Sequence, residues 1–199
     1  MCVCLNQLKI KGNEENINIV NELILKNNDI DFNKLNSFKK DNLLNENEFM
    51  NVSIGIYSYG DYSLLSLLYD TVNEPNKEIL DAIVEALRDI DVNIEYYYYE
   101  GEQCIAGELK YYKGELLKSS HFSRKEDDIK YWSYIIEEEF EDKEWFEMFF
   151  RDYYNMIGEE DKAEIEIDKF NNLIENYNIE EASIMFSRLL NRFIKEIKS

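Results

Sequence analysis

Residues 94–111, IEYYYYEGEQCIAGELKY, decide the fold that we predict from the sequence. The four tyrosines after Ile94 favour a β-strand, because aromatic side chains fit a pleated surface. Residues 100–102 contain a glycine and reverse the chain. Apolar or small residues then alternate from 105 to 111, as they do on one face of a strand. The stretch therefore predicts a hairpin of two antiparallel strands, and residues 116–123 add an edge strand.

Two more strands and two helices are predicted before this hairpin. Alternating apolar residues indicate the strands, and apolar residues three and four apart indicate the helices, the second of which begins at a proline. The strands are expected at 3–11 and 52–56 and the helices at 17–24 and 75–90. Residues 62–69 fit either a strand or a turn, Phe32 and Leu35 lie in a short connection, and residues 36–50 form a polar loop.

The apolar period changes to that of a helix from about Lys125 to the end of the chain. Four stripes predict four helices with short breaks, as in antiparallel bundles, and Gly158 ends the second one. The stripes begin at Ile129, Phe146, Ala163 and Ala182. We therefore predict an α+β chain with an α+β domain at 1–124, whose strand and helix order suits a ferredoxin-like layer, and an acidic helical region at 125–199.

Charge excludes two classes of partner. The chain of 199 residues has 22 basic and 42 acidic side chains, a net charge of −20. This charge repels nucleic acid and anionic membranes, and it favours a basic protein partner. The charge is concentrated, because residues 137–180 hold four basic and sixteen acidic residues, a balance of −12. The absence of a leader-like segment and of a long apolar run predicts a cytoplasmic protein.

Several short motifs in the first 116 residues resemble one known family. They are Asn6–Gly12, Asp31–Leu35, Tyr69-Asp70-Thr71, Glu74-Pro75, the tyrosine-rich strand that ends in Glu100-Gly101, and Ala106-Gly107. Together they resemble the YubB-type ferredoxin-like domain family of phage and plasmid proteins. The resemblance covers roughly residues 4–116 and implies a mobile genetic element as the source. It implies no enzyme activity, so no catalytic residue is carried over.

Three cysteines and one histidine are the residues that could form a chemical site. Cys2 and Cys4 lie two apart and could bind a metal with Cys104 or His121, but the second ligand pair of a typical zinc site is missing. Cys104 and His121 could act as nucleophile and base, yet nothing near either residue marks an oxyanion hole. We therefore expect no metal, no cofactor and no catalytic residue, and buried or incidental thiols instead.

Acidic helices are the remaining signal, because each helix can bury one face and expose carboxylates on the other. We predict that they bind the Lys and Arg side chains of a partner. The predicted residues are Glu137, Glu138, Glu139, Glu141, Asp142, Glu144, Glu147, Glu159, Glu160, Asp161, Glu164 and Asp168. A solvated face that serves only solubility is the simpler interpretation.

These observations predict a non-enzymatic anti-defence protein of a phage or mobile element, similar in action to an anti-CRISPR inhibitor. It would occlude the basic nucleic-acid-binding surface of a host effector nuclease. The alternative is an immunity protein that neutralises a basic nuclease toxin, which would bind its partner through the same attraction between acidic and basic surfaces. The sequence also leaves open a cysteine-dependent enzyme and a domain with no special partner.

Overall fold

The computed structural model describes residues 3–27, 29–39, 44, 49–72, 75, 77–101, 104–138 and 143–197. The chain divides into two compact units, Met1–His121 and Phe122–Ser199, which we call unit 1 and unit 2. Among the described residues, no helix is long and apolar enough to cross a membrane. The fold is α+β, with a large sheet in unit 1 and four helices in unit 2.

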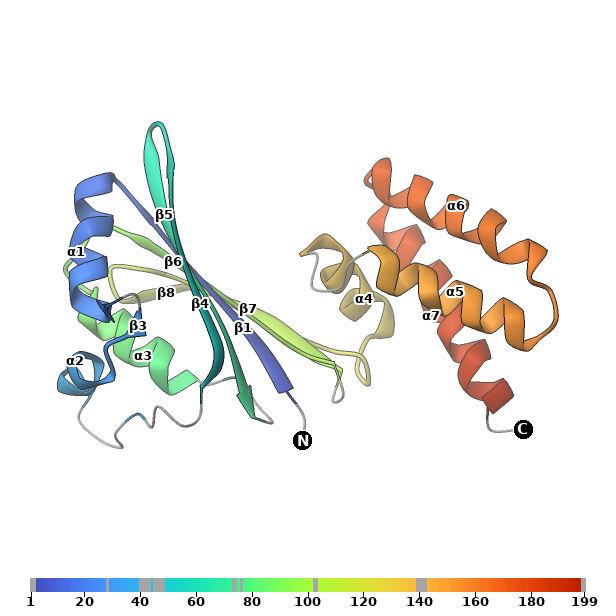
Figure 1. Ribbon diagram of the computed structural model, residues 1–199, viewed down its shortest axis with the longest axis horizontal. Coiled ribbons are helices and arrows are strands. Elements are labelled where there is room, and N and C mark those ends of the chain that lie inside the picture. Colours follow the sequence, from blue (N-terminus) through green and yellow to red (C-terminus); the bar gives the residue numbers. More distant parts are fainter. Residues whose placement is uncertain are drawn as a thin grey trace. The chain divides into compact units, whose positions relative to one another are not determined.

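Unit 1 is built on a six-stranded sheet with helices on one face (Figure 1). Across the sheet the strands are β4 (Met50–Tyr59), β5 (Tyr62–Val72), β1 (Val3–Gly12), β6 (Asn93–Glu100), β7 (Ile105–Tyr112) and β8 (Glu115–Ser123). The helices are α1 (Glu14–Ile24), α2 (Phe32–Ser37) and α3 (Lys77–Ala86), and β2 (Leu25–Lys26) pairs with β3 (Asp29–Ile30). β1 lies in the middle and is antiparallel to both neighbours.

The core of unit 1 lies between the sheet and the helices. Alternate residues of β1, including Leu8 and Ile10, are buried, and α1 buries Ile17, Val20 and Ile24 on the face that its period predicts. These apolar residues belong to one continuous core cluster with the buried face of α3. Burial of this shared surface is what holds the helices on the sheet.

A buried amide joins the three central strands. Asn6 of β1 is 2% exposed, and its Nδ2 donates to the Cys4 carbonyl and to Thr71 Oγ1 of β5, each at 2.9 Å. The hydroxyl of Tyr96 in β6 donates to Asn6 Oδ1. Because a buried polar group without partners is costly, this network favours one register of β1 between its neighbours.

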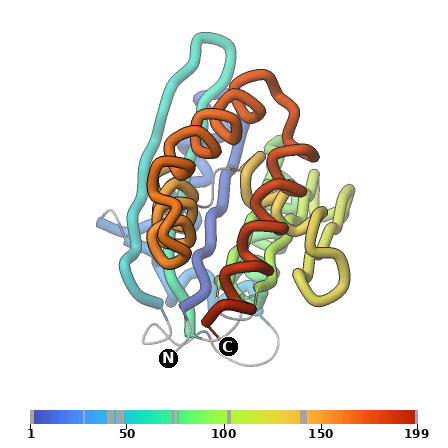
Figure 2. The backbone as a smooth tube through the Cα atoms, turned by 90° about the vertical axis from the view of Figure 1, so that its right-hand side faces the viewer, coloured from blue at the N-terminus to red at the C-terminus, as the bar shows by residue number. Residues whose placement is uncertain are grey.

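Unit 2 is a bundle of four helices in the part of the chain that the structure describes, and Figure 2 shows its backbone from a second direction. The helices are α4 (Asp128–Glu137), α5 (Lys143–Met156), α6 (Asp161–Glu175) and α7 (Ile179–Ile197). Phe186 of α7 packs edge-on against Trp132 of α4 at 4.7 Å between ring centroids and against Phe146 of α5 at 4.9 Å. Phe150 and Phe170 complete the buried cluster.

A carboxylate ties the start of α4 to α7. Asp128 Oδ1 accepts hydrogen bonds from Arg124 Nε at 2.7 Å and from Trp132 Nε1 at 3.2 Å. The hydroxyl of Ser187 in α7 donates to the other oxygen of Asp128. This polar node fixes the pairing of α4 with α7 beside the aromatic core.

The structure decides the points that the sequence left open. Residues 62–69 are a strand, since they lie in β5. The predicted connection at Phe32 and Leu35 is instead the short helix α2, which Asp31 caps by accepting from the Lys34 backbone N–H. The second predicted helix ends at Ala86 rather than at 90. Most of the predicted polar loop at 36–50 lies outside the described residues.

The predicted end of α5 is confirmed. Gly158 has a φ of +72°, and the Glu159 N–H donates to the Tyr154 carbonyl at 2.9 Å. This is the left-handed helix end for which glycine is favoured. The turn brings α6 back beside α5, so the two helices form an antiparallel pair.

Candidate partner-binding surface

Acidic residues begin every helix of unit 2. The first turns hold Asp128 in α4, Glu144 in α5, Asp161 and Glu164 in α6, and Glu180 and Glu181 in α7. Negative charge at a helix N-terminus is favourable by about 0.3–1 kcal/mol per residue. Helix stability therefore accounts for part of the acidic composition of unit 2.

Other carboxylates occupy positions that the helix dipole does not favour. Glu137 is the last residue of α4, where negative charge is unfavourable. Asp152 lies in the second half of α5, and Asp168 lies in the middle of α6. Because these positions gain nothing from the helix ends, helix stability does not account for their charge.

Ion pairs lie along the line where α5 meets α6. Arg151 donates from Nε to Glu164 Oε1 at 3.0 Å and from Nη2 to Glu147 Oε2 at 3.1 Å. Lys143 and Glu175 form a further pair at 3.5 Å. Arg151 thus links α5 to Glu164 of α6 and offsets one of the two carboxylate charges, and Asn171 of α6 donates to Glu147 Oε1 at 3.0 Å.

Further carboxylates flank this line of ion pairs on both helices. We call them, with the apolar residues between them, the acidic hairpin face: Glu144, Met148 and Asp152 of α5, and Asp161, Ile165 and Asp168 of α6. Each trio has the spacing of one helix face, and each lies opposite the buried stripe of its helix. Among the described residues, no cation or side-chain donor contacts these four carboxylates. Met148 is 46% and Ile165 is 56% exposed.

The other predicted acidic residues lie elsewhere. Glu137 is exposed and Glu138 is half-buried at the end of α4, and both lie outside the α5–α6 pair. Glu159 pairs with Lys162 at 2.7 Å in the turn before α6, where Glu160 is exposed. Three predicted residues lie outside the described part of the chain: Glu139, Glu141 and Asp142.

Sequence reasoning did not single out three members of the acidic hairpin face. Asp152 is counted only in the total charge of residues 137–180, and Met148 and Ile165 interrupt the acidic pattern. A helical projection of residues 143–156 and 161–175 would have found them. In each helix it places two acidic residues on one face with an apolar residue between them. Exposed apolar side chains between charges suit a protein interface.

Unit 2 is electrically uneven. Residues 122–199 hold 11 basic and 21 acidic residues, a balance of −10, whereas residues 137–180 within them have −12. The rest of the unit therefore has a balance of +2. Its basic side chains include Arg188, Arg192 and Lys195 of α7. Within residues 137–180, α5 and α6 together have a balance of −4, and the segments before, between and after them hold the other −8.

The cysteine that the structure describes in β1 is poorly suited to chemistry. Cys4 is buried, and burial, with a smaller effect of the nearby Glu100 charge, raises the pKa of its thiol to about 12. A thiol with such a pKa stays protonated at neutral pH, and the thiolate is the reactive form. Cys2 lies outside the described residues.

Cys104 and His121 have separate partners. Cys104 Sγ donates to the Gly101 carbonyl at 3.3 Å, and His121 Nδ1 is hydrogen-bonded to the Tyr98 hydroxyl at 2.8 Å. No hydrogen bond joins the thiol to the imidazole in the described chain. Within that same part of the chain, no group of three or more His, Cys, Asp or Glu side chains is placed to hold a metal ion.

The carboxylates near the sheet are also compensated. Glu108 is 3% exposed and forms ion pairs with Lys110, at 3.2 Å, and with Lys118. Burial alone would raise the pKa of Glu108, but the hydrogen bonds from the two lysines outweigh it and lower the pKa. Glu108 is therefore a charged structural group and not a proton donor at neutral pH.

Comparison of the chain with family models, with curated proteins and with solved structures found no match in any of the three. The resemblance to the YubB-type family therefore stays a prediction from the sequence motifs. The geometry of the site carries the functional argument.

Proposed function

We propose that this protein is a non-enzymatic binding protein whose acidic hairpin face binds a basic surface of another protein. The single observation that carries the proposal is the pattern of that face. Two exposed apolar residues each lie between two carboxylates that have no partner among the described residues. Such a face offers charge for recognition and apolar area for burial.

The partner is a protein that itself binds nucleic acid. Lysines and arginines that contact phosphates also form charge-assisted hydrogen bonds with carboxylates. Occupation of such a surface by Glu144, Asp152, Asp161 and Asp168 would exclude the nucleic acid and inhibit the partner. We assign the protein on this basis to anti-defence inhibitors of a phage or mobile element, with a CRISPR effector nuclease as the preferred target in the host cytoplasm.

We further propose that unit 1 has a ferredoxin-like core extended by β7 and β8. The order β4-β5-β1-β6, with α1 after β1 and α3 between β5 and β6, supports this assignment. A ferredoxin-like core agrees with the family that the sequence motifs of unit 1 resemble. A ferredoxin-like fold does not by itself imply a particular reaction, so it is compatible with a binding protein.

Affinity capture tests the proposal. The tagged chain is incubated with nuclease-treated host lysate, retained proteins are identified, and the complex is then challenged with DNA. We expect a stoichiometric basic protein that DNA releases, because DNA and the acidic hairpin face compete for one surface. A retained protein that DNA cannot release would contradict occlusion. The identity of the partner separates a defence effector from a nuclease toxin.

A further inference from the structure

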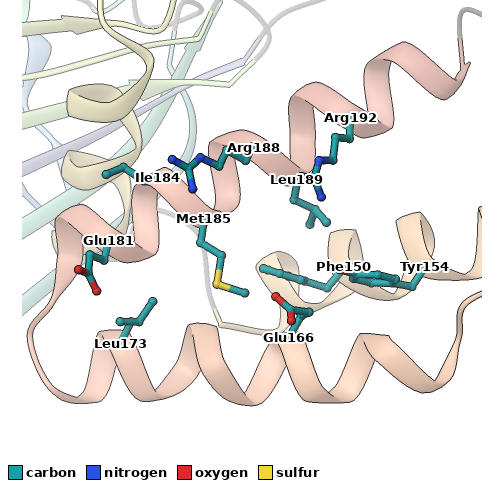
Figure 3. A pocket seen from close by; sticks show the side chains of 10 residues that line it. All are labelled: Phe150, Tyr154, Glu166, Leu173, Glu181, Ile184, Met185, Arg188, Leu189 and Arg192. Atoms are coloured by element: carbon teal, nitrogen blue, oxygen red, sulfur yellow. The ribbon is translucent and has the colours of Figure 1, made fainter.

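A cavity of about 460 Å³ opens between α5, α6 and α7 of unit 2 (Figure 3). Its volume lies in the range of small-molecule sites. Buried Phe150 and Leu189 and half-buried Leu173 and Met185 form its apolar lining. Sites of this kind combine an apolar lining with a few polar groups that orient the ligand.

Two arginines of α7 line the same cavity without a carboxylate partner. Arg188 and Arg192 are one helical turn apart, and neither is in an ion pair within the described chain. Like charges at this spacing destabilise a helix slightly, and Arg188 lies too far from the end of α7 to gain from the helix dipole. Helix stability therefore does not account for this pair.

The carboxylates that line the cavity already have partners. Glu166 pairs with Lys169 at 2.5 Å, and Glu181 accepts a hydrogen bond from Asn178 Nδ2 at 2.8 Å. The donors of Arg188 and Arg192 are thus the groups left for a ligand. Guanidinium groups bind carboxylates through parallel N–H···O bonds.

Tyr154 adds a neutral hydroxyl to the lining. Burial and the Glu166 charge raise the pKa of Tyr154, and Arg192 opposes this rise, so the hydroxyl stays protonated and able to donate at neutral pH. In Figure 3 the Arg192 side chain points from α7 toward Leu189, on the side of the cavity where Phe150 and Tyr154 lie. In Figure 3 the side chains of Met185 and Leu189 extend from α7 into the space above α6.

We propose that this cavity binds a monoanionic carboxylate carried on an apolar body. Arg188 and Arg192 hold the carboxylate, and the ligand's apolar part lies against Phe150, Met185 and Leu189. The flexible methionine lets the lining adapt to the apolar part. This site is separate from the acidic hairpin face, and the proposal does not depend on the function proposed above.

Calorimetry with decanoate, below its micelle concentration and at physiological salt, tests the site. We expect saturable binding at a 1:1 ratio, with a shift of the Met185 methyl signal in NMR spectra. Arg188→Gln and Arg192→Gln should each weaken binding at least tenfold. Decyltrimethylammonium, which has the same tail and the opposite charge, should not displace decanoate.

Lys195→Gln is the matched control, because it removes one positive charge from α7 outside the cavity lining. It should leave the affinity for decanoate unchanged, and circular dichroism should show all three variants folded. Equal weakening by Lys195→Gln would overturn the proposal, because it would show only a general charge effect. Failure of decanoate to bind, or displacement by the cationic analogue, would also overturn it.

Discussion

Alkaline pH should unfold unit 1 through its buried tyrosines. Tyr69 and Tyr96 are 2% and 0% exposed, and burial raises the pKa of both hydroxyls well above their ordinary value of 10.0. Above pH 10 the unfolded chain loses these protons while the folded chain keeps them. Stability is thus present below that pH and falls above it by about 1.4 kcal/mol per pH unit for each group.

At roughly pH 11.5 the two tyrosines together lower the free energy of unfolding by about 4 kcal/mol. The total free energy of unfolding of a typical domain is about 5–15 kcal/mol. Burial also raises the pKa of Cys4 and of Tyr98 to about 12. These groups act with the same sign and add to the loss until the pH reaches that value. The free energy of unfolding should therefore fall steeply between pH 10 and pH 12.

Urea unfolding at a series of pH values measures this slope, and phenolate absorbance reports the tyrosine protons directly. Tyr96→Phe should reduce the slope by about 1.4 kcal/mol per pH unit. Tyr177→Phe is the control, since this side chain is 91% exposed and its hydroxyl is in water in both states. A slope that Tyr96→Phe leaves unchanged would refute the reasoning, as would less phenolate at pH 10 in folded Tyr96→Phe than in the folded wild type, because the buried Tyr96 should contribute none there.

Three further outcomes follow from packing and burial. Asp128→Ala should lower the stability of unit 2 by about 2–4 kcal/mol, because it removes the node with Ser187, and tryptophan fluorescence in urea would show it. Gly107→Ala should cost about 1–3 kcal/mol in thermal unfolding, because a Cβ there would lie against the Tyr98 hydroxyl. In a variant with Cys2→Ser and Cys104→Ser, Cys4 should react with a disulfide reagent at pH 8 roughly 1000-fold more slowly when folded than in urea, because burial raises the pKa of its thiol.

Much of the fold could be predicted because the apolar residues repeat with the period of the strand or helix that they form. The tyrosine-rich stretch before Gly101 forms β6, and the predicted strand after it forms β7. The stripes of unit 2 match its four helices because each helix buries one face. Residues 62–69 were ambiguous because β5 buries alternate residues while Leu64 and Leu68 lie on its other face, which conceals the alternation.

The candidate site could be predicted only in part, because charge in a sequence carries no information about pairing. Glu147, Glu164 and Asp168 all count equally as acidic residues in the sequence. In the structure, Arg151 binds Glu147 and Glu164 but not Asp168. That difference depends on how α5 packs against α6. The cavity of α7 also needs three helices to form, so Arg188 gave no signal in the sequence beyond a mildly basic segment.

The most direct test of the central claim removes the charge of the acidic hairpin face alone. The quadruple variant Glu144→Gln, Asp152→Asn, Asp161→Asn and Asp168→Asn is compared with wild type in capture of the partner. Roughly 0.5 kcal/mol for each exposed pair predicts about 30-fold weaker binding.

The matched control removes four exposed charges from unit 1: Glu14→Gln, Glu15→Gln, Glu22→Gln and Asp89→Asn. Both variants have the same net charge, so only the position of the lost charge differs. The account predicts that capture is lost with the first variant and retained with the second. Equal capture by both variants, or loss with the control alone, would contradict the claim that the acidic hairpin face binds the partner.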